Sequence, residues 1–131
     1  MEHEILTQTI IGCAMKVHSA LGPGFLESVY RNAMAHELRK SGLRVECEHP
    51  ITVRYDGVMV GEFSADMWVE GKVLLELKAN HALAPVNEVQ LVNYLTATGV
   101  EIGLLLNFGG AKLEFKRKTR TYRPRTSDQE G

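Results

Sequence analysis

The sequence has few of the features that would place a chain of 131 residues outside the ordinary globular proteins. It has two cysteines, Cys13 and Cys47, without CxxC spacing, which excludes a disulfide framework and a CxxC metal or redox pair. No apolar run approaches the ~20 residues of a membrane helix. The first residues, Met1–Glu4, lack the basic and apolar segments of a signal peptide. The sequence therefore predicts a cytoplasmic protein whose cysteines are reduced.

The composition is 44% hydrophobic and 24% charged, which excludes collagen-like and disordered classes. The length predicts one domain, assigned to residues 1–118. A net charge of -1 argues against a protein that coats nucleic acid, but the charge is uneven: residues 112–131 carry seven basic and three acidic side chains. Such a basic end can bind anions. We expect residues 119–131 to be a flexible, solvated tail.

Hydrophobic periodicity predicts an α/β (α+β) fold with a mixed sheet flanked by helices. The first helix covers residues 6–21, and Gly22-Pro23-Gly24 separates it from a second helix that ends at Ser41. The remaining predicted elements are strands over 44–55 (with Pro50 inside), 58–69 and 73–79, a helix over 85–98, and strands over 102–108 and 113–118. The last of these carries charges that suit a sheet edge.

Two charged residues, Glu76 and Lys78, interrupt the most apolar predicted strand and share one of its faces. If Glu70-Gly71-Lys72 is a three-residue hairpin loop, Asp66 lies opposite Glu76, with Cβ atoms ~5 Å apart. Two carboxylates at that distance repel unless a cation lies between them, and carboxylate oxygens suit Mg²⁺ or Mn²⁺. A solvated hairpin face would show the same short pattern, so the residues alone leave both interpretations open.

Four helical residues are further candidates, each with an ordinary structural alternative. Gln90 and Tyr94 share a face of the third helix but could be a surface amide and a core tyrosine. His18 lies at the edge of the apolar stripe, where a packed boundary histidine is common. Glu27 lies in the first turn of its helix, where the helix dipole favours an acid in any case.

The segment His18–Tyr30 (HSALGPGFLESVY) resembles the signature of the GxxExxY proteins, small proteins of bacteria and archaea. The resemblance runs from about Ile10 to Arg117 and includes Asp66 with the block Glu76–Ala79. That family is grouped with the PD-(D/E)xK nuclease superfamily, whose restriction-endonuclease-like core is helix, three strands, helix, strand. The spacing of Gln90 and Tyr94 also resembles the QxxxY motif of RecB-type nucleases. One departure is Ala65, which replaces the proline of the superfamily motif at a position that varies among its members.

The resemblance implies a metal-dependent nuclease that hydrolyses phosphodiester bonds of DNA or RNA. Asp66, Glu76 and the Leu77 carbonyl would bind Mg²⁺ or Mn²⁺, with Lys78 helping to activate water. Gln90 would position Lys78 or the nucleic acid, Tyr94 would belong to the catalytic set, and His18 or Glu27 would complete the metal shell. The residues expected to contact phosphates are Lys116, Arg117, Lys118 and Arg120.

Three other interpretations remain open at this point. The chain could be a non-catalytic module that retains the nuclease fold and binds nucleic acid or protein, since fold does not fix function. It could be a junction-resolving nuclease, which would require a homodimer. It could also be a structural dimerisation protein in which the hairpin face is simply solvated.

Overall fold

The computed structural model describes residues 3–120 and contains eight helices and strands there. They are α1 (Glu4–Leu21), α2 (Glu27–Lys40), β1 (Val45–Tyr55), β2 (Val58–Val69), β3 (Val73–Lys78), α3 (Pro85–Thr98), β4 (Ile102–Asn107) and β5 (Glu114–Thr119). This order agrees with the predicted one, so the α+β fold is confirmed. Within residues 3–120, no helix combines the length and apolar character that crossing a membrane would need.

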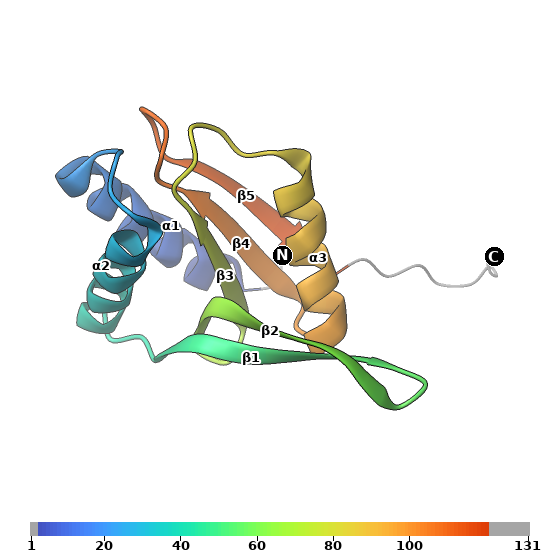
Figure 1. Ribbon diagram of the computed structural model, residues 1–131. Helices are drawn as coiled ribbons and strands as arrows, with labels where there is room; N and C mark the ends of the chain where they lie inside the picture. The colour runs from blue at the N-terminus through green and yellow to red at the C-terminus, as the bar shows by residue number, and fades with distance from the viewer. Residues whose placement is uncertain (1–2, 121–131) are drawn as a thin grey trace.

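The strands form one mixed sheet in the order β1-β2-β3-β4-β5 (Figure 1). β3 and β4 are parallel to each other at the centre, and the other neighbours pair antiparallel. Both central strands are almost completely buried, which explains their continuous apolar sequence. β1 lies at one edge and continues through Pro50, which pairs with Ser64. An edge strand tolerates proline because the missing N–H is not needed by a second neighbour.

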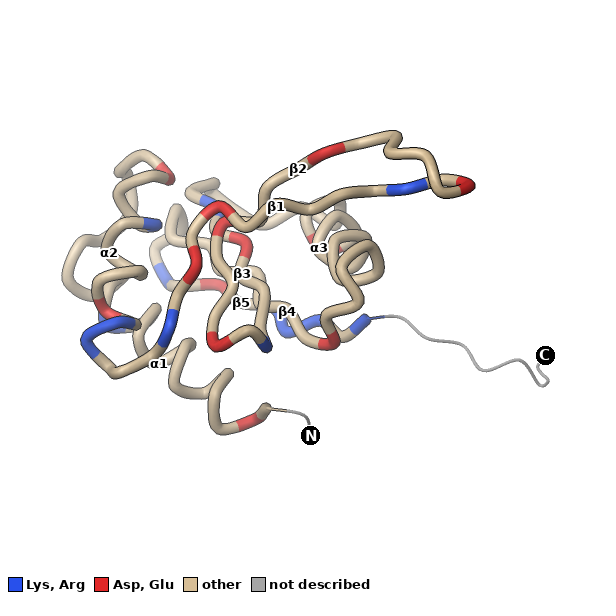
Figure 2. Tube along the Cα trace, turned by 90° about the horizontal axis from the view of Figure 1, so that it is seen from below, with Lys and Arg blue, Asp and Glu red and all other residues tan. Residues whose placement is uncertain are grey.

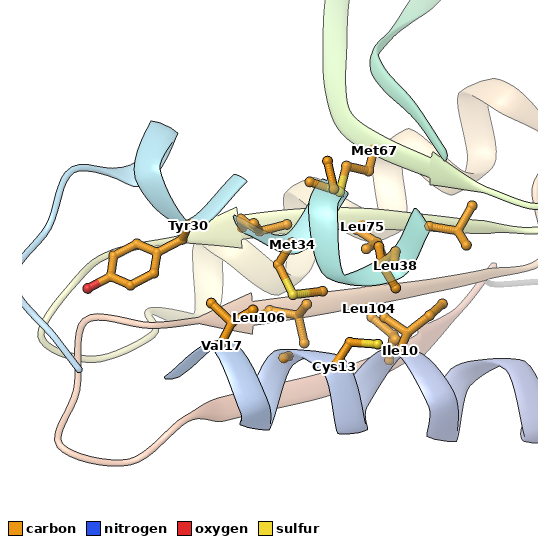
Figure 3. Packing of buried hydrophobic residues seen from close by; sticks show 14 of the residues in the cluster. Ile10, Cys13, Val17, Tyr30, Met34, Leu38, Met67, Leu75, Leu104 and Leu106 are labelled. Carbon is orange, nitrogen blue, oxygen red and sulfur yellow. The ribbon is translucent and has the colours of Figure 1, made fainter. Parts of the chain in front are cut away.

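Helices cover both faces of the sheet, with α1 and α2 on one face and α3 on the other (Figure 1). The larger core lies under α1 and α2 (Figure 3). It includes Ile10, Cys13, Val17, Tyr30, Met34, Leu38, Met67, Leu75, Leu104 and Leu106. Side chains alternate along a strand, so Leu75 and Leu77 face this core while Leu74 faces α3. Glu76 therefore points to the α3 face.

Tyr30, the last residue of the segment His18–Tyr30 that connects α1 with α2, has a structural role. The Tyr30 hydroxyl donates to the Gly22 carbonyl at 2.5 Å and accepts from the Phe25 N–H at 3.2 Å. Its ring is fully buried and stacks on Phe108, with ring centroids 4.8 Å apart. Gly22 has a φ of 70°, which side chains rarely adopt. The contacts of Tyr30 thus stabilise the turn between α1 and α2, after which Glu27 begins α2.

The loop that follows β3 is held by the fully buried Asn107 at the end of β4. Its Oδ1 accepts the N–H of Asn80 at 2.9 Å, and its Nδ2 donates to the Asn80 carbonyl at 3.0 Å and to Glu114 Oε1 at 2.8 Å. A Cβ atom added to Gly109 would lie 2.2 Å from the Asn80 carbonyl oxygen. Close backbone packing therefore connects the end of Lys78's strand to the β4–β5 loop.

Gly109→Ala is expected to destabilise the protein by about 1–3 kcal/mol, because backbone must move to admit the methyl group. The control is Gly12→Ala in the exposed middle of α1, where nothing lies within 4 Å of the added atom. That change should stabilise by about 0.5–1 kcal/mol through helix propensity. Urea unfolding measures both, and a Gly109→Ala midpoint equal to wild type would contradict the close approach.

The β1–β2 hairpin extends beyond the sheet. Asp56 and Gly57 have φ values of 53° and 76°, as a type I′ turn requires, which agrees with the predicted tight turn. β2 pairs with β3 only from Met67 to Val69. Residues 52–64, called the hairpin arm below, therefore project from the body and lie over α3 (Figure 2).

Both cysteines are free thiols, Cys13 buried and Cys47 partly so.

The described chain continues slightly into the predicted tail. Thr119 belongs to β5 and pairs with Ile102, and the Arg120 N–H donates to the Glu101 carbonyl at 2.8 Å. The rest of the predicted tail, residues 121–131, lies outside the described residues.

Candidate active site

The strands β2 and β3 separate at Asp66. Val69 pairs with Val73 and Met67 with Leu75, as a three-residue hairpin loop predicts, and the next pair would be Asp66 with Glu76. Regular pairing stops before that pair. The carboxylates instead bond to the opposite backbone: the Asp66 N–H donates to Glu76 Oε2 at 3.0 Å, and the Leu77 N–H donates to Asp66 Oδ2 at 2.7 Å. Both carboxylates are thereby fixed in one gap between two strands.

The other side of β2 is irregular at the same position. Glu48 on β1 lies between the paired residues Cys47 and His49 and has a φ of 55°, unusual for a residue other than glycine. Ala65 packs in the core under α3, whereas Met67, two residues later, packs in the core under α1 and α2. Side chains two residues apart in β2 therefore point to opposite sides of the sheet across Asp66. This places the Asp66 side chain at the boundary between the two layers.

The environment of Glu76 disfavours a negative charge. The side chain is 6% exposed, and burial followed by the charge of Asp66 raises the pKa of Glu76 to about 8. The hydrogen bond from the Asp66 N–H and the Lys78 ammonium oppose this increase, and Glu27 adds to it. A carboxyl with a pKa near 8 is a frequent sign of a functional site. A cation would relieve the same repulsion and favour the ionised form.

Charged groups from α2 complete the cluster. Burial and the Asp66 charge raise the pKa of Glu27, while Lys78 and Arg31 partly oppose that increase. Arg31 also lies 3.5 Å from Asp66 Oδ1 and 3.7 Å from Glu48 Oε2. Lys78 makes no ion pair closer than 4 Å in the described part of the chain, although it acts on both Glu27 and Glu76. Glu27, Asp66 and Glu76 therefore influence one another electrostatically, and Arg31 and Lys78 partly compensate their charges.

The α3 candidates lie on the other side of this cluster. Tyr94 is 9% exposed, and burial, then Glu76 and Asp66, raise the pKa of its hydroxyl. Gln90, one turn earlier, lines a groove together with Tyr94. α3 thus brings Tyr94 close enough to be influenced by both carboxylates, with Gln90 next to it on the groove side.

His18 is engaged elsewhere. Its Nε2 lies 3.0 Å from the Gly110 carbonyl oxygen, and its ring lies 6.3 Å from that of Phe108. Whether His18 or Glu27 is the early-helix member of the site stays a prediction, but the two residues have different surroundings. Glu27 is the one coupled electrostatically to Asp66 and Lys78, while His18 holds the β4–β5 loop.

The four basic residues expected to contact phosphates, which are Lys116, Arg117, Lys118 and Arg120, do not lie on one surface. Lys116 and Lys118 pair with Leu105 and Gly103 and so face α3, whereas Arg117 points to the opposite face and donates to Thr7 Oγ1 at 2.7 Å. Lys118 bonds to Glu88 Oε1 at 3.0 Å. Arg120 forms an ion pair with Glu101. Contact of these four residues with phosphates remains a prediction, and three of them have partners within the fold.

The donor set fits a small divalent cation. N–H and C=O of one strand residue point to the same neighbouring strand, so the Leu77 carbonyl points into the gap that holds Asp66 and Glu76. Residues 3–120 contain no group of three or more His, Cys, Asp or Glu side chains that could hold a metal ion, so protein side chains offer at most two acidic ligands here. Mg²⁺ commonly binds through one or two carboxylates and several waters, so the pair with this carbonyl provides a suitable ligand set.

The sequence did not predict the roles of Arg31 and Glu48. Arg31 lies four residues after Glu27 and therefore on the same face of α2, a spacing that could have indicated it. Glu48 gives no comparable signal, because its importance comes from an unusual backbone conformation opposite Asp66.

The comparison with known proteins places this chain in a superfamily. The sequence model of the PD-(D/E)XK nuclease superfamily matches residues 4–118, and the chain belongs to that superfamily, as its motifs indicated. No curated protein is significantly similar in sequence.

Two solved structures share the fold. The crystal structure of SSO0001 aligns with a TM-score of 0.56 and 15% identity, over 92% of this chain and 60% of that one. An alkaline exonuclease from Laribacter hongkongensis aligns with a TM-score of 0.52 and 12% identity, over 92% of this chain and 72% of the exonuclease. The chain thus spans 60% of SSO0001, which is less than two thirds, and both likenesses concern the fold alone.

Proposed function

We propose that this protein is a metal-dependent nuclease that hydrolyses phosphodiester bonds in DNA or RNA. One observation supports this most directly. At Asp66 and Glu76 the regular backbone pairing of β2 with β3 stops, and each of the two carboxylates accepts a backbone N–H of the opposite strand instead. The two acids are held in one gap, and burial followed by the charge of Asp66 raises the pKa of Glu76 to about 8. A buried acid next to a second carboxylate is typical of a site that binds a cation.

Asp66, Glu76 and the Leu77 carbonyl would hold Mg²⁺ or Mn²⁺, which supplies charge neutralisation at the phosphate and lowers the pKa of water. Lys78 would orient the attacking water and stabilise the charge that develops on the phosphoryl oxygens. Arg31 would help to orient the Asp66 side chain through its 3.5 Å contact. Glu27 can accept a proton or a water hydrogen bond at the edge of the site, since its pKa is raised.

Tyr94 and Gln90 would contact the nucleic acid rather than the cation. The Tyr94 hydroxyl, whose pKa is raised from a value already well above neutral, is protonated near neutral pH and can donate to a phosphate oxygen. Lys116 and Lys118, on the same face as α3, would add sequence-independent and salt-sensitive contacts. We propose a cytoplasmic protein that acts on nucleic acid.

The test is cleavage of labelled single-stranded DNA, duplex DNA and RNA by purified protein with Mn²⁺, compared with a Lys78→Ala variant. We expect Lys78→Ala to lower the rate about 100-fold or more, because it removes a preorganised positive charge at the reacting phosphate. Lys72→Ala is the matched control, since it removes an exposed lysine from the β2–β3 turn, and should cleave like wild type. Equal rates in all three proteins would refute the role of Lys78.

The alternative is a non-catalytic binding module that retains the nuclease fold. The observation that favours it is the contact between Arg31 and Asp66, which already supplies positive charge where the cation would bind. Calorimetric titration with Mg²⁺ and Mn²⁺ separates the two functions. Saturable binding that is lost in Asp66→Asn supports the nuclease, whereas no heat at millimolar metal together with no cleavage supports the module.

A further inference from the structure

A deep groove separates the hairpin arm from α3. Its volume is about 820 Å³, within the range of roughly 300–1,000 Å³ in which proteins bind ligands of drug or nucleotide size. The arm and the helix both contribute side chains to it. Those used below are Thr52, Arg54 and Phe63 from the arm, and Gln90, Asn93 and Tyr94 from α3.

Tyr94 links the groove to the candidate active site. It lines the groove, and the charges of Glu76 and Asp66 act on its hydroxyl. The ring of Phe63 lies 5.8 Å from that of Tyr94 and is inclined to it by 35°. A nucleic-acid strand with one phosphate at Asp66 and Glu76 would therefore place a neighbouring nucleotide between the hairpin arm and α3.

The lining chemistry matches an unpaired base on an anionic backbone. Phe63 is 48% exposed and offers a ring face for stacking, and Gln90 and Asn93 offer amides that can both donate and accept hydrogen bonds. Arg54 contributes a positive charge, and none of the residues between 3 and 120 that line the groove carries a carboxylate. Aromatic faces with a positive charge and adaptable hydrogen-bonding groups are the usual means of holding single-stranded nucleic acid.

The exposed ring of Phe63 favours unpaired bases over a duplex. In a base-paired helix the base faces are stacked on one another, so Phe63 could not stack on a base without separating the strands. The arm and α3 also enclose the groove from two sides, as Figure 2 shows for the elements themselves. A single strand can enter between them with its bases turned toward the rings.

We propose that the groove between the hairpin arm and α3 binds unpaired bases, so that the substrate is a single-stranded nucleic acid or a single-stranded end. The proposal rests on the proposed function for the position of the scissile phosphate. Binding to the groove, however, requires no hydrolysis, and the two can be tested separately.

The experiment is fluorescence anisotropy in EDTA, where no cleavage takes place. The probes are a labelled ten-nucleotide thymidine oligomer, a ten-nucleotide uridine oligomer, a duplex of equal length, and an abasic strand of equal length that has the backbone but no bases. We expect the single strands to bind at least fivefold more tightly than the duplex or the abasic strand. Phe63→Ala should weaken single-strand binding by about tenfold, and Phe63→Tyr should restore it.

Phe115→Ala is the matched control, because Phe115 is also an exposed phenylalanine on a strand but lies outside the groove. It should bind like wild type, and the melting temperature of Phe63→Ala should be unchanged. Equal binding of duplex, abasic and ordinary strands, or an unaltered affinity in Phe63→Ala, would overturn the proposal. So would a dimer in solution that Phe63→Ala dissociates without any effect on oligonucleotide affinity, since the groove would then hold a second copy.

Cleavage assays with Mn²⁺ distinguish this failure from failure of the nuclease function. Base-dependent binding without cleavage in wild type supports the groove and refutes the hydrolysis. Cleavage of duplex and single strand at equal rates, with Phe63→Ala unaffected, supports the hydrolysis and refutes the groove.

Discussion

Asp66→Asn is expected to lower metal-dependent cleavage at least about 100-fold while the protein remains folded. Asparagine keeps the shape of the side chain and an oxygen that can accept the Leu77 N–H, but it lacks the negative charge that a divalent cation requires. The same change removes repulsion with Glu76. It also removes the ion pair with Arg31, a partly exposed contact of small energetic value.

Thermal unfolding provides the second readout for this variant. Without metal, Asp66→Asn should melt at the same temperature as wild type or higher, and added Mg²⁺ or Mn²⁺ should stabilise it less, because a bound ligand stabilises the folded state. Asp56→Asn is the control, since Asp56 lies in an exposed hairpin turn whose positive φ asparagine tolerates. Cleavage that survives in Asp66→Asn would exclude this residue as a metal ligand. A lower melting temperature with no metal dependence would assign it a structural role.

The part of the site that depends on local spacing could be predicted from the sequence. A loop from Glu70 to Lys72 defines the register of β2 against β3, and that register alone places Asp66 opposite Glu76. The surrounding apolar residues predict that the strand is central and buried, which makes a charge on it unusual. The order of helices and strands follows from periodicity and turn residues in the same way.

The irregular features could not be predicted, because they depend on contacts between distant segments. Regular pairing would have left the two carboxylates side by side on an intact ladder, whereas the strands separate and the carboxylates take over backbone N–H groups. That outcome depends on the exchange of faces along β2 and on Arg31 from α2. Similarly, the basic side chains from 116 to 120 were all expected to contact phosphates. Strand alternation turns Arg117 to the opposite face, and Lys118 and Arg120 pair with Glu88 and Glu101.

The pH dependence of stability should report directly on Glu76. Its pKa is about 8 in the folded protein and near the ordinary 4.5 in the unfolded chain. Below pH 4.5 Glu76 is protonated in both the folded and the unfolded protein. The contribution of the neutral Glu76 to the free energy of unfolding is then complete. Above that pH the unfolded chain releases its proton first, so stability falls as pH rises toward 8 and then levels off. The slope attributable to this one group is at most about 1.4 kcal/mol per pH unit.

Glu76→Gln should abolish this slope, because glutamine stays neutral and keeps an oxygen that can accept the Asp66 N–H. In EDTA, wild type should lose up to a few kcal/mol relative to the variant between pH 5 and pH 8, measured by urea unfolding at several pH values. Glu62→Gln, an exposed position on the hairpin arm, should follow wild type at every pH. Millimolar Mn²⁺ at pH 8 should recover stability in wild type and much less in Glu76→Gln, since the cation favours the ionised acid. Parallel curves for wild type and Glu76→Gln would show that Glu76 is ionised at neutral pH without metal, and that the carboxylate pair is not destabilising.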